Sequence, residues 1–357
     1  MSENSVPVTL VTGFLGSGKT TLLNRLMREN ALTNCALIIN EFGDVGIDHL
    51  LVESVDEGIV ELSDGCLCCT IRGDLIDTFT NLLNRSDDLE RIIIETTGLA
   101  DPAPILHAVM GHPVLSESLR LDGVITLVDG VNGSDTLNIH QEAIKQVAVA
   151  DRIMLTKTDL ISEIDELQTR LGALNPSAEV LCANELSNLK EHLFECGLYN
   201  PSTKTADVKR WLGDEAAKKH HHHHHDVNRH DSSIRAFTLK TEKLIDAGTL
   251  TTFIDLLRSA HGPNLLRVKG IIAVKEHPEK PVVIHGVQQI FHPPATLPSW
   301  PDEERNTRLV MITKDLSENF VRRLFDAFMG TAKTDTPDKQ ALDENPLAVP
   351  GFSGSFS

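Results

Sequence analysis

Residues 13–20 read GFLGSGKT and follow an apolar run, VTLV, at residues 8–11. The glycines at positions 13 and 18 and the Lys-Thr pair match the P-loop, a glycine-rich turn that binds phosphate between a strand and a helix. Apolar residues at positions 22, 23, 26 and 27 then share one face of a helix. In such a loop backbone N–H groups point at a polyphosphate, and the positive end of the helix dipole strengthens the attraction. The stretch therefore predicts a nucleoside triphosphate site.

The side chains of this loop have separate expected roles. Lys19 reaches the outer phosphates, and the Thr20 hydroxyl ligates Mg²⁺. A glycine-rich turn before an ordinary helix is the simpler alternative, but it does not require the strand, the lysine and the threonine in this order. We expect the phosphates to be bound by Gly13, Gly16, Ser17, Gly18, Lys19, Thr20 and Thr21.

The overall composition is ordinary for a globular protein in water. The chain has 357 residues, of which 41% are hydrophobic and 24% charged, and its formal net charge is −18. Because nucleic acid requires a basic binding face, this charge argues against general nucleic-acid binding. No apolar run is long enough to cross a membrane, and residues 1–7 lack a signal pattern. We therefore expect a cytoplasmic protein without membrane or nucleic-acid partners.

Residues 1–202 alternate apolar strands with amphipathic helices. Most of the strands are continuous apolar runs, the pattern of a parallel sheet covered on both faces. Helical patterns lie between them, as at residues 74–83 and 164–174. This order predicts a doubly wound α/β P-loop domain with a mostly parallel sheet, in which ligands bind at the carboxyl ends of the strands. The expected strands are 8–11, 36–39, 91–95, 124–128, 152–156 and 179–182.

The composition changes after residue 202. Residues 203–232 are polar and include six consecutive histidines, which indicates a histidine-rich linker or loop. Residues 233–329 return to apolar runs and predict a smaller α+β domain. Its expected strands are 234–239, 265–274, 281–287 and 308–313, and its expected helices are 250–260 and 316–328. Residues 330–357 are rich in Asp, Pro, Gly and Ser, which predicts a disordered tail.

A second strand end carries an acidic residue. Residues 91–98 read RIIIETTG, so an apolar strand ends at Glu95. In P-loop proteins a carboxylate at such a position holds Mg²⁺, and Gly98 can bring its N–H to the γ-phosphate. A strand that simply stops at a charge is the alternative, which the P-loop in the same chain disfavours. We expect Lys19 and Glu95 to be the catalytic residues.

A third strand ends in the sequence TKTD, residues 156–159. It is similar to the Asn-Lys-x-Asp motif that recognises guanine, with Thr156 in place of Asn. Asp159 can accept the amino and imino protons of guanine, while the stem of Lys157 packs over the base. Because adenine lacks this pair of donors, such a site rejects ATP. In the alternative interpretation Asp159 caps the helix that follows. The threonine removes the carboxamide that would contact guanine N7.

Three cysteines lie together at Cys66, Cys68 and Cys69. In a reducing cytosol such a cluster indicates metal or redox chemistry rather than disulfides. Thiolates are soft ligands that suit Zn²⁺, Co²⁺ or Cu⁺. A structural zinc knuckle needs a second Cys-x-x-Cys hook, which this sequence lacks, and buried apolar cysteines or a redox pair are further alternatives. An acidic segment follows the second expected strand, where a P-loop GTPase places a switch region, and Glu41 is its candidate ligand.

These segments together resemble the CobW/YjiA-type family of P-loop GTPases. The resemblance rests on residues 13–20, 40–43, 65–69, 95–102 and 156–159, and on LRVKG at residues 266–270. It implies that residues 6–329 form a slow GTPase that binds a transition metal through the cysteines and transfers it to a client metalloprotein. The implied cofactors are GTP, Mg²⁺ and Zn²⁺, with Co²⁺ as the alternative, and homodimer formation is left open.

The histidine run resembles those of other members of this family. It can collect metal ions near the cysteine site, or it can be a solvated spacer. We favour a zinc metallochaperone driven by GTP hydrolysis. The alternatives are cobalt delivery for cobalamin biosynthesis, a P-loop small-molecule kinase and a passive metal buffer. The expected metal ligands are Cys66, Cys68, Cys69, Glu41, Thr20 (for Mg²⁺), His220, His221, His222, His223, His224 and His225.

Overall fold

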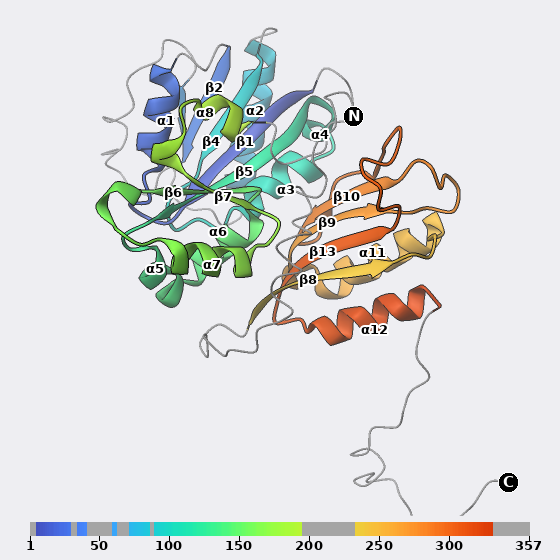
Figure 1. Cartoon of the computed structure of the whole chain (residues 1–357). Helices are drawn as coiled ribbons and strands as arrows, with labels where there is room; N and C mark the ends of the chain where they lie inside the picture. The colour runs from blue at the N-terminus through green and yellow to red at the C-terminus, as the bar shows by residue number, and fades with distance from the viewer. Residues whose placement is uncertain are drawn as a thin grey trace, which may run out of the picture.

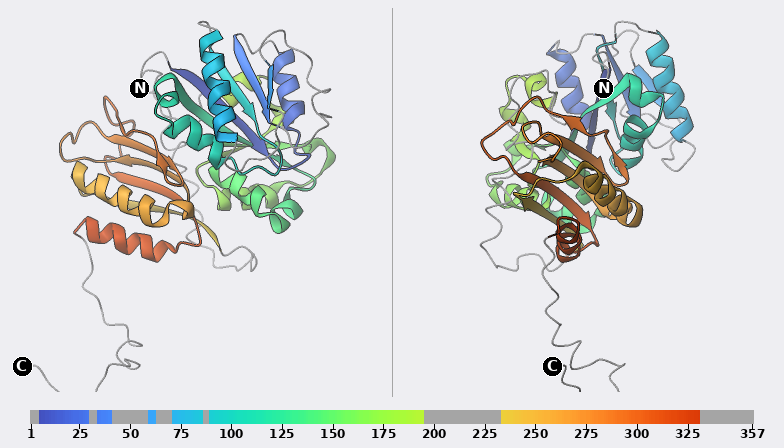
Figure 2. Two further views of the ribbon diagram at one scale, coloured as in Figure 1. Left: turned by 180° about the vertical axis from the view of Figure 1, so that it is seen from behind. Right: turned by 90° about the vertical axis from the view of Figure 1, so that its right-hand side faces the viewer.

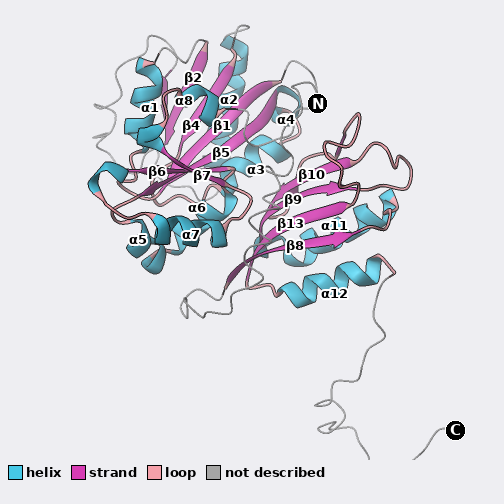
Figure 3. Ribbon diagram, viewed as in Figure 1, coloured by secondary structure: helices cyan, strands magenta, loops and turns pink. Residues whose placement is uncertain are grey.

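Two β-sheets organise the chain (Figure 1). The computed structural model describes residues 5–29, 34–40, 59–62, 71–85, 89–194 and 233–330. A parallel sheet covered by helices comes first, and an antiparallel sheet with helices on one face follows it (Figure 3). Within these described ranges, no helix has both the length and the apolar character needed to cross a membrane.

The parallel sheet places the end of its first strand at the centre. Its described strands are β1 (Val6–Gly13), β2 (Cys35–Asn40), β3 (Ile59–Leu62), β4 (Arg91–Glu95), β5 (Leu119–Asp129), β6 (Arg152–Thr156) and β7 (Glu179–Cys182). They lie in the order β3-β2-β4-β1-β5-β6-β7, and every neighbouring pair is parallel. This arrangement confirms the predicted doubly wound fold. The strand order reverses at β1, so ligands are expected at its carboxyl end.

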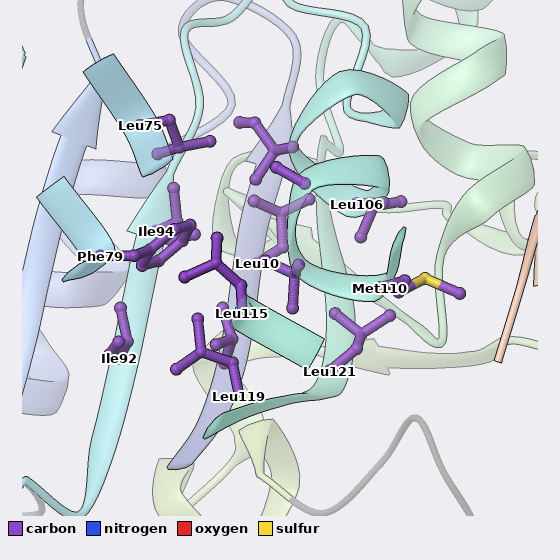
Figure 4. Close-up of a cluster of buried hydrophobic side chains, with 14 of the residues drawn as sticks. Leu10, Leu75, Phe79, Ile92, Ile94, Leu106, Met110, Leu115, Leu119 and Leu121 are labelled. Carbon is purple, nitrogen blue, oxygen red and sulfur yellow. The ribbon is translucent and has the colours of Figure 1, made fainter. Parts of the chain in front are cut away.

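Helices cover both faces of this sheet, which explains the continuous apolar runs of its strands. The described helices are α1 (Lys19–Arg28), α2 (Ile71–Arg85), α3 (Ala103–Gly111), α4 (Leu115–Ser118), α5 (Gly133–Ile139), α6 (Gln141–Val149), α7 (Asp165–Leu174) and α8 (Leu189–Leu193). On one face α1 packs against Val11 and Ile93. On the other face α2 and α3 pack against Leu10 and Ile94 (Figure 4). Successive residues of β1 and β4 thus enter different cores.

The second sheet is antiparallel and is covered on one face by two helices (Figure 2). Its strands are β8 (Ile234–Thr241), β9 (Leu265–Ile272), β10 (Val282–Val287), β11 (Ile290–Phe291), β12 (Ala295–Thr296) and β13 (Thr307–Lys314). The order is β11-β10-β9-β13-β8, and β12 pairs with β10. The helices α11 (Ala247–His261) and α12 (Glu318–Phe328) pack on it through residues such as Phe253 and Phe325. Asp246 and Ser317 cap their first turns.

Sequence patterns located most of these elements. The strands β4, β6 and β7 have the bounds predicted for them, and the other predicted strands overlap their predictions. The strands β3, β11 and β12 were not predicted, because β11 and β12 are two-residue pairings and β3 lies in a segment without clear periodicity. The histidine-rich linker and the disordered tail lie outside the described residues, and the domain boundaries at 202, 232 and 329 stay predictions.

The face of the second sheet that α11 and α12 leave uncovered packs against the first domain. Leu266 and Ile312 belong to the same apolar cluster as Val147 of α6 and Leu171 of α7. Val287 of β10 joins the cluster around α3. The helix α6 contacts β9, and α3 contacts β10 and β11. The two domains therefore share hydrophobic cores instead of touching only through a polar surface.

Charged side chains are also buried at this interface. Asp151 follows α6, and its Oδ1 atom lies 2.9 Å from the Lys269 Nζ atom and also accepts a hydrogen bond from Arg267 Nη2. Asp151 Oδ2 accepts a hydrogen bond from the backbone N–H of Val124 at 3.0 Å. The side chains of Arg267 and Lys269 are each 1% exposed.

Burial, together with the positive charges of Arg267 and Lys269 and the neighbouring His292, holds the pKa of His285 well below its ordinary value.

We expect Asp151→Ala to lower the free energy of unfolding by about 3–5 kcal/mol, because it leaves two buried cations without their carboxylate. The ion pair between Arg305 and Glu279 provides the control, since these side chains are 60% and 75% exposed. Glu279→Ala should change the free energy of unfolding by only about 0–1 kcal/mol. Urea unfolding followed by circular dichroism measures both effects. Equal effects of the two substitutions would contradict a buried ion pair at Asp151.

Candidate functional site

The loop between β1 and α1 has the backbone conformation of a phosphate cradle. Gly13, Gly16 and Gly18 have φ angles of 143°, 73° and 89°, in the left-handed region that favours glycine. At Gly13 a Cβ atom would also lie 2.4 Å from the carbonyl oxygen of Leu127. Glycine is thus required there both by the backbone angle and by the neighbouring strand. The loop opens at the carboxyl end of the central strand, where the sheet topology predicts a ligand.

Lys19 lies over this loop. Its side chain is largely buried, and its Nζ atom donates hydrogen bonds to the carbonyl oxygens of Gly13 at 2.9 Å and Phe14 at 3.3 Å. The ammonium group is therefore held at the mouth of the loop. From there it can exchange these carbonyls for phosphate oxygens, which carry far more negative charge.

A hydroxyl and a carboxylate meet beside the loop. Thr20 Oγ1 donates a hydrogen bond to Glu95 Oε1 at 3.0 Å. The contact follows from the sheet, because β4 pairs with β1 in a register that places Glu95 beside Val11. The backbone N–H of Thr96 donates to the Val11 carbonyl at 3.0 Å, which extends this pairing beyond the strand. These two oxygen donors are of the type that Mg²⁺ prefers, so the residues present fit a magnesium ion.

Gly98 lies against the same loop from the other side. A Cβ atom at Gly98 would come 2.5 Å from the backbone nitrogen of Leu15, so only glycine allows this approach. The segment that leaves β4 is thus packed directly on the phosphate-binding loop. The sequence-predicted residues Lys19, Thr20, Glu95 and Gly98 are brought together at one edge of the sheet.

The third predicted segment is tied to the loop by its threonine. Thr156 Oγ1 donates a hydrogen bond to the carbonyl oxygen of Ser17 at 2.8 Å. Lys157 has a φ angle of 56°, and its Nζ atom donates to Asp129 Oδ2 at 2.7 Å. Burial raises the pKa of Asp129. Hydrogen bonds from Lys157, from the Asn132 side chain and from nearby backbone N–H groups lower the pKa by more than burial raises it, so the net shift is downward. Asp129 is therefore a carboxylate partner for Lys157 at neutral pH.

Asp159 does not cap a helix, so that alternative interpretation is wrong. It lies in a short 3-10 helix, Thr158–Leu160, while α7 begins only at Asp165. Asp159 Oδ1 accepts a hydrogen bond from Asn184 Nδ2 at 2.6 Å. Asn184 belongs to the turn Ala183–Glu185 directly after β7. Sequence reasoning missed this turn, and the only signal for it was its position after a predicted strand.

A cavity of about 250 Å³ lies behind the phosphate-binding loop. It is bounded by Phe14 and Leu15 of the loop, by the end of β5 and by α5 and α6. Phe14 stacks on His140, with 4.4 Å between the ring centroids, and closes one side. The cavity therefore lies between the phosphate-binding loop, the end of β5 and α6.

The expected transition-metal site lies outside the described residues. This applies to Glu41, Cys66, Cys68, Cys69 and the histidines 220–225. Within the described ranges there is no group of three or more residues that could hold a metal ion. The cysteine segment connects the end of β3 to the start of α2, and Glu41 follows the end of β2. The strands β2 and β3 end at the same edge of the sheet as β4, because β2 is parallel to both of them.

Comparison with known proteins agrees with this geometry. Residues 7–182 match the CobW/HypB/UreG nucleotide-binding domain, and residues 234–329 match the cobalamin synthesis protein CobW C-terminal domain. Zinc chaperone YjiA of Escherichia coli (strain K12) is 32% identical over 326 residues, which cover 90% of this chain and 98% of that protein. Zinc chaperone CobW of Pseudomonas aeruginosa is 29% identical over 340 residues, which cover 88% of each chain.

A solved structure supports the same relationship over both domains. The crystal structure of Zn(II)-bound YjiA GTPase from E. coli superposes with a TM-score of 0.65 at 27% sequence identity, covering 91% of this chain and 99% of that one. The resemblance inferred from the sequence motifs is thereby confirmed. The chain belongs to the CobW/HypB/UreG family of P-loop nucleotide-binding proteins and carries the CobW C-terminal domain.

Proposed function

We propose that this protein is a cytoplasmic metallochaperone that hydrolyses GTP and transfers Zn²⁺ to a client metalloprotein. The observation that carries the proposal is the meeting of the phosphate-binding loop, Glu95 and the Lys157–Asp159 segment at one edge of a parallel sheet. The relatives named above are zinc chaperones, which favours zinc over cobalt as the cargo. They do not favour a small-molecule kinase or a passive metal buffer. Delivery of the metal to a client metalloprotein and formation of a homodimer stay predictions.

Nucleotide binding follows from the loop geometry. The backbone N–H groups of residues 13–18 surround the β-phosphate, and Lys19 moves from the loop carbonyls to the outer phosphates. Thr20 and Glu95 would hold Mg²⁺, and the ion would supply positive charge against the phosphate oxygens. Gly98 lies close enough to the loop to place its backbone beside the γ-phosphate. Thr21 follows in the first turn of α1.

Base recognition follows from the segments after β6 and β7. Asp159 accepts the two guanine donors, and Lys157 lies over the base. Thr156 has a different task from the asparagine it replaces, since its hydroxyl anchors the segment to the carbonyl of Ser17. Asn184 orients the Asp159 carboxylate through its hydrogen bond at 2.6 Å.

Asp159→Asn should weaken GDP and GTP binding about 10- to 100-fold, because the amide offers one acceptor where guanine presents two donors. Isothermal titration with GDP, GTP and ATP measures this loss. Asp165→Asn is the matched control, since Asp165 lies in the first turn of α7 and has no assigned contact with the base. Unchanged GTP affinity in Asp159→Asn would sink the assignment of guanine recognition.

Metal binding is assigned to Cys66, Cys68 and Cys69, with Glu41 as a further ligand and the histidines 220–225 as a collecting segment. Coupling to the nucleotide is supported by the sheet order. The strand β2 lies between β3 and β4, and all three are parallel, so β2 and β3 end at the same edge of the sheet as Glu95. Ordering by GTP of the segments that follow β2 and β3 would bring the thiolates into a binding arrangement, and hydrolysis would release them.

Zinc should therefore bind more tightly in the Mg-GTP state than in the Mg-GDP state. A coupling free energy of about 1–3 kcal/mol corresponds to a difference of about 5- to 150-fold in affinity. Competition with a chromophoric chelator, in the presence of either GDP or a non-hydrolysable GTP analogue, measures it. Equal zinc affinities in both states would refute nucleotide control of the cargo.

The double substitution Cys66→Ala and Cys68→Ala should abolish tight zinc binding, because it removes two of the three clustered thiolates. GDP affinity should remain unchanged. Cys35→Ala is the control, since Cys35 is a half-buried cysteine at the start of β2, outside the 66–69 cluster. Metal analysis after dialysis gives the stoichiometry. Full zinc content in the double variant would place the site elsewhere in the chain.

A further inference from the structure

A buried amide connects α6 to the segment that leaves β4. Gln146 lies within α6 and is 0% exposed. Its Nε2 atom donates hydrogen bonds to the carbonyl oxygens of Gly98 at 3.2 Å and Ala100 at 3.1 Å. A buried amide must satisfy its donors, and here both go to the same short segment. One side chain therefore fixes two carbonyl groups directly after Glu95.

The helix that carries this amide is itself firmly held. The backbone carbonyl of Gln146 accepts a hydrogen bond from Thr126 Oγ1 of β5 at 2.7 Å. Lys145 Nζ lies 3.0 Å from Asp101 Oδ2, which adds a half-exposed ion pair to the same segment. A functional backbone is held most accurately when its support is packed on rigid elements. The segment 98–101 is thus attached to a helix that is in turn attached to the sheet.

The orientation of the amide is determined by its partners. The atoms of Gly98 and Ala100 that contact the amide are carbonyl oxygens, so the NH₂ side of Gln146 must face them. Within the described residues, Gln146 Oε1 is buried and has no hydrogen-bond partner, so no other group dictates the rotamer. Gln146 also lines the cavity behind the phosphate-binding loop. The hydrogen bonds to the Gly98 and Ala100 carbonyls therefore replace the hydrogen bonds that the amide would make to water.

We propose that Gln146 is a positioning residue for GTP: its amide holds the Gly98 segment against the phosphate-binding loop in the conformation that senses the γ-phosphate. The inference rests on the proposed GTPase function. Gln146 is not assigned a contact with the nucleotide and acts through Gly98, which the glycine-only approach to Leu15 places beside the loop. Fixing the Gly98 carbonyl fixes the planar peptide between Gly98 and Leu99, so only the φ and ψ angles of Gly98 remain to place its own N–H.

The test is Gln146→Leu, which keeps the size of the side chain and removes both donors. We expect kcat for GTP to fall about 10- to 100-fold, with a smaller change in KM for GTP. The preference for a GTP analogue over GDP should fall as well, while GDP affinity stays within about twofold of wild type. Stopped-flow phosphate release and competition against a fluorescent GDP provide these values.

Asn175→Leu is the matched control. Asn175 is also a fully buried amide beside α6, and its Nδ2 atom donates to the carbonyls of Val147, Ala148 and Ala150. Loss of the Asn175 amide destabilises the end of the same helix and leaves the contacts of Gln146 with the Gly98 segment in place. We therefore expect Asn175→Leu to lower the melting temperature and to leave the GTP-to-GDP preference unchanged.

Gln146→Glu provides a second variant in case the apolar one fails to fold. Its carboxylate would face two carbonyl oxygens, so we expect at least the same loss of GTP preference. The proposal is overturned if either folded Gln146 variant keeps the wild-type kcat and preference, or if Asn175→Leu loses both to the same extent. Failure of the wild-type protein to hydrolyse GTP would instead overturn the proposed function, so the two failures are distinguishable.

Discussion

Parallel pairing of β1 with β4 on one side and β5 on the other is the constraint on which the candidate site depends. It brings the ends of three strands to the same edge, so that the loop after Gly13 opens between Glu95 and Asp129. The Thr20–Glu95 contact follows from this adjacency, and the Lys157–Asp129 ion pair follows from the next pairing along the sheet, of β5 with β6. The positive φ angles of the loop glycines follow from this strand pairing, because the phosphate-binding loop must turn close to the neighbouring strands.

Buried polar groups give the site its second level of organisation. Gln146, Asn175 and Asp151 lie on or near α6, and each makes hydrogen bonds to backbone groups or to charged side chains. In a low-dielectric interior such contacts are costly to break, so they restrict the helix to one position. The same helix contacts the segment after Glu95 through Gln146 and is followed by Asp151, the carboxylate that binds β9. The nucleotide site and the C-terminal domain thus share one structural support.

The sequence predicted the parts of this site whose signals are local. The phosphate-binding loop, Glu95 and the Lys157–Asp159 segment each follow a continuous apolar strand, and the structure brings these segments to one edge. Gln146 and Asn184 could not be found in this way, because their partners lie far away along the chain. Thr156 was expected to lack the carboxamide contact with guanine N7, and the structure additionally gives its hydroxyl a hydrogen bond to the loop. The cysteines, Glu41 and the histidines fall outside the described residues and stay predictions.

The ion cluster of Asp151, Arg267 and Lys269 has a consequence for how such proteins can be recombined. The carboxylate belongs to one domain and both cations to the other, so neither half has a neutral, well-packed surface on its own. Exchange of the C-terminal half between homologues succeeds only when the incoming half supplies matching cations and apolar contacts. Sequence change in the C-terminal half is therefore tied to inheritance of the nucleotide-binding half as one unit.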